Sequence, residues 1–152
     1  MSEIKIHPEV ASIGSYLYQL HSVSVFWQES KEGFGEKALY VQQPTTFDAP
    51  DTLTSFKKSY NLSVKVFDVD SSTAFYHAER LADEVRMKRG IIPLITPEGD
   101  ETGDYVRINR IEARKSEIGA AILQLTWDSR YLYERAEYVA LEDVQFISEV
   151  RE

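Results

Sequence analysis

The stretch from Ser59 to Gly90 changes its hydrophobic period halfway along, and this restricts the possible folds more than any other segment. Its first part alternates apolar and polar residues, as a strand with one buried face does. Its second part repeats apolar residues every three or four positions, as an amphipathic helix does, with Ser71 or Ser72 as the expected cap and Gly90 at the end. The sequence therefore predicts a β–α unit whose buried faces are formed by Tyr60, Leu62, Val64 and Val66 in the strand and by Phe75, Ala78, Leu81, Ala82 and Val85 in the helix.

The N-terminal third predicts a helix, a hairpin and a loop. Apolar spacing after a proline predicts an amphipathic helix over Pro8–Leu20. Two segments rich in β-branched and aromatic residues, 22–27 and 37–44, are separated by glycines and predict a β-hairpin. The following stretch, 44–53, has two prolines, two aspartates and no period, which favours a loop that binds something.

The C-terminal half predicts a long hairpin. Residues 105–117 predict a strand with a bulge near Asn109-Arg110, and residues 119–134 predict a strand long enough to overhang its sheet. Helical spacing over 141–150 predicts a third helix. The predicted fold class is α+β, a twisted and mainly antiparallel sheet with two or three helices packed on it and a long C-terminal β-hairpin arm, in a single domain spanning residues 1–152.

Composition and charge exclude several classes of protein. The chain has no cysteine, which excludes disulfides, thiolate metal sites and cysteine nucleophiles. No apolar run approaches the length of a membrane helix, so we expect no membrane partner. The net charge of −8 opposes binding to a phosphate backbone, so DNA is expected to pass this protein without being gripped.

No motif for catalysis or cofactor binding emerges. His7, His21 and His77 are scattered without a zinc-hydrolase pattern, and no phosphate-binding glycine motif is present. Asp68 and Asp70 are interpreted as residues that end a strand and cap a helix, with a carboxylate pair for acid–base chemistry as the remote alternative. We expect no catalytic residues, no metal, no cofactor and no enzymatic activity.

Two groups of residues are candidates for contacts. The turn-rich segment from Thr96 to Asp104 is interpreted as an acidic loop that faces a lumen or a partner, with a hard-cation site as the alternative. Its carboxylates are those of Glu98, Asp100, Glu101 and Asp104. Aromatic and arginine residues are enriched in protein interfaces, although plain core and an aromatic ligand cage remain open for these positions. The interface candidates are Trp127, Arg130, Tyr131, Tyr133 and Arg135 in the final strand, with Phe47 and Asp48 in the predicted loop.

The order of these segments resembles the tail terminator proteins, also called tail completion or minor capsid proteins, of long-tailed bacteriophages. The resemblance rests on "YNLSVKVFDVDSSTAFYHAERLADEVR", "GDYVRINRIEARKSE" and "AAILQLTWDSRYLYER", and it covers the chain from Pro8 to Arg135. The resemblance concerns the order and general character of the segments and no invariant motif, so no individual residue role is carried over. The region after Arg135 and the length of the acidic loop lie outside it.

The resemblance implies a structural virion protein that forms a hexameric ring at the head-proximal end of a tail tube. Such a ring ends tube polymerisation, docks to the head connector or stopper protein, contacts the tail tube protein and lets DNA pass. Its place would be the head–tail interface of the virion, and the host cytoplasm during assembly. The alternatives are another ring of the head–tail junction or a soluble adaptor module outside any virion.

Overall fold

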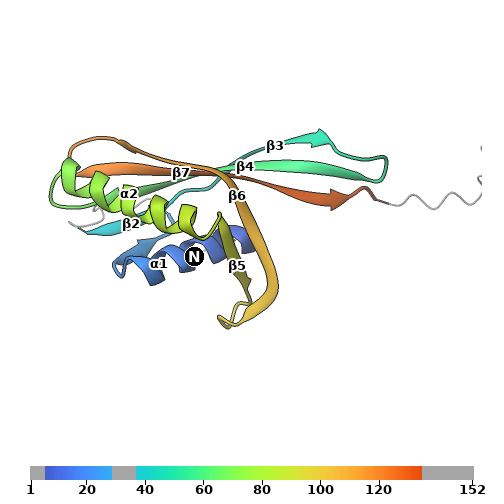
Figure 1. Ribbon diagram of the computed structural model, residues 1–152, viewed down its shortest axis with the longest axis horizontal. Coiled ribbons are helices and arrows are strands. Elements are labelled where there is room, and N and C mark those ends of the chain that lie inside the picture. The colour runs from blue at the N-terminus through green and yellow to red at the C-terminus, as the bar shows by residue number, and fades with distance from the viewer. Residues whose placement is uncertain (1–5, 29–36, 135–152) are drawn as a thin grey trace, which may run out of the picture.

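The computed structural model describes residues 6–28 and 37–134, and within them two helices and seven strands. The strands form a curled sheet in the order β1-β2-β4-β7-β6-β5, with β3 paired to β4 beside this path (Figure 1). The α+β class and the mainly antiparallel sheet are confirmed. The elements are α1 (Pro8–Leu20), β1 (Ser24–Phe26), β2 (Ala38–Val41), β3 (Thr45–Pro50), β4 (Ser55–Phe67), α2 (Ser71–Met87), β5 (Ile91–Ile95), β6 (Glu101–Lys115) and β7 (Ala120–Leu132).

The predicted β–α unit is confirmed. Of the residues expected to cap its helix, Asp70 does so: its carboxylate accepts the backbone N–H of Thr73 at 2.7 Å, and neither Ser71 nor Ser72 is the cap. Asp70 takes this place because its extended backbone points a charged acceptor at the free N–H groups of the first turn. At the other end Gly90 adopts a φ of 75°, and a Cβ there would lie 2.6 Å from the carbonyl oxygen of Ile108.

Both helices cover one face of the sheet and form the core with it (Figure 1). The alternating residues of β4 and β7 supply the sheet side of this core, and α2 adds its predicted apolar stripe. Helix α1 packs closely because Gly14 has no side chain: a Cβ there would meet the indole of Trp27 at 2.2 Å. No helix in the described residues is long and apolar enough to cross a membrane.

Two N-terminal predictions were wrong. Segments β1 and β2 are neighbours but run parallel, with Val25 opposite Leu39, so they do not form a hairpin. A hairpin turn can join only antiparallel neighbours, because a parallel pair needs a connection that carries the chain back to the end where the first strand begins. The predicted loop over 44–53 is largely strand β3, which pairs antiparallel with β4 from Thr45 to Pro50. Its side chains are almost all exposed, so it has no buried face to give it a period.

The C-terminal hairpin is confirmed. Strands β6 and β7 pair antiparallel, and the register shifts between Ile108 and Arg110, where the bulge was predicted. The acidic segment is shorter than predicted, because β6 already begins at Glu101 and pairs with β5 through Ile95. The predicted third helix and Arg135 lie outside the described residues.

One end of the sheet projects beyond both helices; we call this part the arm and the part under the helices the body (Figure 1). The arm consists of β3, the β4 residues 55–59, the β7 residues 128–132 and Tyr133, whose backbone N–H donates to the carbonyl of Thr54. Strand β7 does extend past its partner β6, which pairs with it only as far as Ile108 and Trp127. It does not extend alone, however, since β4 accompanies it from Phe67 to Ser55 and β3 flanks β4.

Candidate functional site

The face of the arm that continues the core face carries aromatic side chains. Phe56 stacks on Tyr131 at a centroid distance of 5.5 Å and lies 5.4 Å from the ring of Tyr133. These three residues keep the parity of the buried positions in β4 and β7, but no helix reaches over them (Figure 1). Tyr133 is 46% exposed, whereas Trp127 on the same face of the sheet is fully buried. The arm therefore presents core-like residues to the outside.

A hollow of about 360 Å³ lies on this part of the arm. It brings together three of the predicted interface residues, Phe47, Asp48 and Tyr131, although they come from β3 and β7. Strand β4 lies between these two strands and contributes Phe56 and Lys58 to the same hollow. The hollow is lined by His7, Thr46, Phe47, Asp48, Phe56, Lys58, Tyr60 and Tyr131.

The N-terminus of α1 fixes the base of the arm through a chain of hydrogen bonds. His7 caps α1 by accepting the backbone N–H of Glu9 on Nδ1, and its Nε2 lies 3.2 Å from the hydroxyl of Tyr60. The Tyr60 hydroxyl in turn lies 2.6 Å from that of Tyr131. Burial, and then the hydrogen bond with Tyr131, raise the pKa of Tyr60, so it stays a neutral hydrogen-bonding group.

A second connection ties the same helix to β7. The carboxylate of Glu9 accepts the indole N–H of Trp127 at 3.1 Å and the hydroxyl of Ser129 at 2.7 Å. Bonds to an ionised acceptor are stronger than neutral ones, and this one joins positions 120 residues apart in the chain. The arm is therefore held in a fixed direction at its base rather than hanging from a loop.

The opposite face of the arm is polar and largely paired. Asp128 accepts the hydroxyl of Ser59 at 2.6 Å and the side-chain amide of Asn109 at 2.9 Å. At the tip the guanidinium of Arg130 lies 2.9 Å from the carboxylate of Asp51. These contacts hold the three strands together, and they leave the aromatic face as the apolar side of the arm.

Comparison with known proteins gives this chain a family. It is 40% identical over 146 residues to the phage-like element PBSX protein XkdJ of Bacillus subtilis strain 168, a match that covers 96% of this chain and all of XkdJ. Protein YqbJ of the same organism is 42% identical over the same length, with the same coverage. This chain belongs to the XkdJ family. No protein-family model matches it.

One solved structure has a distantly similar fold. A chain from the virion of a native gene transfer agent particle aligns over 77% of this XkdJ-family chain and 84% of its own, at a TM-score of 0.46 and 14% identity. At this level the likeness adds nothing to the assignment of family or function.

The predicted contact residues of the XkdJ-family chain fall into three places. Trp127 is part of the core at the base of the arm, so its side chain is not on the free surface. Phe47, Asp48, Arg130, Tyr131 and Tyr133 lie on the arm. The four carboxylates of the acidic segment lie at the far end of the β5–β6 hairpin, and all are exposed. Within the described residues no group of three His, Cys, Asp or Glu side chains could hold a metal ion.

Phe56 and Lys58 in the hollow, and His7 and Glu9 at the base of the arm, were not among the predicted site residues. Phe56 and Lys58 continue the parity of Tyr60 and Leu62 toward the N-terminus, so extending the alternation would have identified them. His7 and Glu9 carry no such signal. Their role depends on α1 packing across β4 and β7, which no local pattern reveals.

Proposed function

We propose that this chain is a structural virion protein that forms a ring at the head-proximal end of a phage tail tube. The ring ends tube polymerisation, docks to the head connector and lets DNA pass without binding its sequence. In this proposal the arm contacts the neighbouring subunit, and the protein catalyses nothing.

The observation that carries the proposal is the uncovered aromatic face of the arm. Aromatic side chains on a rigid projecting sheet are typical of a protein interface, because they bury a large area at a low cost in side-chain entropy. Tyr133 is 46% exposed on this face. Phe47 pairs with Ser59 and adds a 61% exposed aromatic side chain on the opposite face of the arm. The relationship to XkdJ, a protein of a phage-like element, supports a role as a virion component. The resemblance of the order of segments in this chain to that of tail terminators supports the ring.

The shape suits a closed ring with a repeated contact. An arm on one side of the body and its docking surface on another form a heterologous interface, which closes into a ring when the rotation between copies fits. The resemblance to tail terminators implies six copies. Each subunit carries a formal charge of −8, which would keep passing DNA free of tight contacts.

The proposal is tested by the native mass of the purified chain over a wide concentration range, and by negative-stain images of the same samples. Purified tail tubes from the same element are then added. Rings of six, or chain bound only at tube ends, are expected. A ring that binds a head connector but no tube would favour another junction ring. A monomer that binds neither component at any concentration would contradict the proposal.

A matched pair of variants tests whether the arm carries the contact. Phe47→Ser with Tyr133→Ser removes exposed aromatic surface from the arm and should abolish ring formation and tube binding. Tyr18→Ser removes an aromatic residue of similar exposure, 51%, from α1 and should leave both unchanged. Thermal unfolding of both variants should stay near the wild type, because these side chains are exposed.

A further inference from the structure

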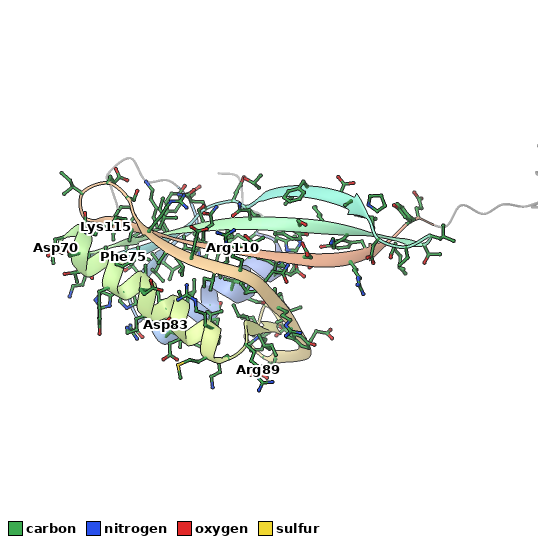
Figure 2. All side chains as sticks on the ribbon, turned by 45° about the horizontal axis from the view of Figure 1, so that its top comes forward. Asp70, Phe75, Asp83, Arg89, Arg110 and Lys115 are labelled. Carbon is green, nitrogen blue, oxygen red and sulfur yellow. The ribbon has the colours of Figure 1, made fainter. Side chains whose placement is uncertain are left out.

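A second hollow, of about 320 Å³, lies between the end of α2 and the bulge of β6. Three arginines line it, Arg86 and Arg89 from α2 and its end and Arg110 from β6; Figure 2 labels the last two. Its apolar lining comes from Val85, Ile108 and Ile111. The hollow thus combines concentrated positive charge with an apolar floor on a chain whose net charge is −8.

The three arginines are not equivalent. Hydrogen bonds to Glu79 at 2.6 Å and to Asp83 at 2.8 Å hold the guanidinium of Arg86 and raise its pKa, and its other nitrogen donates to the carbonyl of Ile111. Arg86 is therefore a fixed wall of the hollow. Arg89 has no ion-pair partner among the described residues, and Arg110 has only a 3.5 Å contact with Glu112 at the surface. Both remain available to an anionic partner.

Backbone strain marks the same place. Arg89 has a φ of 60°, the left-handed conformation that an L residue other than glycine rarely adopts. Residues held in such conformations cluster at binding sites, where the surrounding structure enforces them. Here the hydrogen bond from the N–H of Ile108 to the carbonyl of Gly90, at 2.7 Å, fixes the chain immediately after Arg89.

The matching negative charge lies at the far end of the β5–β6 hairpin. We call the segment from Thr96 to Asp104 the acidic turn; it lies below the sheet in Figure 1. Its shape is fixed by hydrogen bonds from the backbone of Asp100 to the side chain of Thr96 and from the Thr102 hydroxyl to the carbonyl of Leu94. In the described part of the chain, none of the carboxylates of Glu98, Asp100, Glu101 and Asp104 has an ion-pair partner.

We propose that the arginine hollow binds the acidic turn of a second copy of this chain. The inference rests on the proposed ring and supplies it with a contact apart from the arm. It makes the acidic turn face a partner subunit rather than the lumen. The hollow and the turn lie at opposite ends of one hairpin. The hollow of one copy can therefore bind the turn of one neighbour while its own turn binds the hollow of the other neighbour, as a heterologous ring requires.

Charge explains why this occupant fits. Copies that each carry a charge of −8 repel one another, so association needs a local contact of opposite charge that also fixes orientation. The hollow supplies Arg89, which has no ion-pair partner among the described residues, and Arg110, whose contact with Glu112 is long and exposed, and the turn supplies unpaired carboxylates. The exposed Pro97 in the turn can cover the apolar floor, which a nucleic-acid phosphate would leave uncovered.

Charge reversal on each side tests the contact. Arg89→Glu with Arg110→Glu makes the hollow acidic, and Glu98→Lys, Asp100→Lys and Glu101→Lys together leave only Asp104 acidic in the turn and make it basic. Each of these two variants alone should lose self-association by about 100-fold or more, because like charges then face each other. A 1:1 mixture of the two variants should associate again in alternating order, since every contact then joins opposite charges.

The readouts are native mass and concentration-dependent amide shifts at residues 86–111, in low and high salt. Lys88→Glu is the matched control, because Lys88 adjoins Arg89 but does not line the hollow, and it should behave as the wild type. Thermal unfolding checks that all variants fold. A mixture that stays monomeric, or a reversed hollow that associates normally, overturns the inference. Duplex DNA binding that is lost with Arg89→Glu would also overturn it, in favour of a nucleic-acid partner.

The two proposals fail separately. If the charge variants assemble and cap tail tubes as the wild type does, the ring stands and the hollow is not its contact. If the wild type self-associates, each charge variant loses this association and their mixture regains it, but no sample binds tube ends or a head connector, the contact exists without the tail-end function.

Discussion

The body and the arm are built on the same two strands, β4 and β7, but helices cover these strands only in the body (Figure 1). In the body, the alternating residues pack under α1 and α2 and are fully buried, as Leu62 and Trp127 are. A few residues further along the same face, Tyr131 and Tyr133 retain the alternation without a cover. One alternating sequence pattern thus forms buried core where the helices cover it and exposed surface where they do not, and the position of the N-terminus of α1 sets the boundary.

Trp127→Ala should cause the largest loss of stability, because it leaves a cavity in the core at the junction between the body and the arm. The indole is fully buried and stacks on Tyr60 at 5.1 Å, so a loss of about 3–5 kcal/mol in the free energy of unfolding is expected. Chemical denaturation measures it. Tyr133→Ala, on the same face of the arm, should cost about 0.5 kcal/mol or less. Equal losses would mean that the arm is as firmly packed as the body.

Gly14→Ala tests how closely α1 packs within the body. A Cβ at this position would overlap the indole of Trp27, so the ring must move, and a loss of about 1–3 kcal/mol is expected. Gln19→Ala, at an exposed position of the same helix, is the control and should change stability little. A neutral Gly14→Ala would show that α1 can shift without harm.

Glu9→Gln weakens the link between the body and the arm. The amide keeps one acceptor oxygen but turns an NH₂ group toward the donors of Trp127 and Ser129, so about 1–2 kcal/mol should be lost. Amide hydrogen exchange should rise most in β7 residues 128–132 and less near Leu123. Glu117→Gln, which breaks an exposed pair with Lys65, should leave this exchange pattern unchanged. Uniform acceleration over both regions would argue against a local link.

Acid should destabilise the body through His21. Burial lowers the pKa of His21, and the neighbouring His77 and Arg80 lower it further, together with Lys37, while Asp68 opposes them. The unfolded chain, with a histidine pKa near 6.5, then binds more protons than the folded chain, so stability falls as the pH drops below about 6.5. Thermal unfolding between pH 5 and 7.5 measures the slope. His21→Gln should flatten it, and an unchanged slope would assign it to other groups.

The candidate site was only partly accessible from sequence. Residue type predicts Tyr131 as a contact, the predicted loop contributes Phe47 and Asp48, and the fold brings all three to one hollow. Residue type predicts Trp127 as a contact too, but it is core, because residue type and parity are identical on both sides of the point where α1 begins. The arginine hollow was not anticipated, since its residues come from the end of α2 and the bulge of β6, which meet only after folding.

The sequence alone determined the elements whose signal is local. Period two gave β4 and β7, period three to four gave α1 and α2, and the break in alternation gave the bulge of β6, because each of these patterns arises from burial of one face of one element. Tertiary structure decided the rest. Strand β3 exists because β4 offers it a free edge, β1 pairs with β2 in parallel, and the arm is exposed because α1 begins at its base and does not extend over it. Partners remote in sequence set these features, so no local period records them.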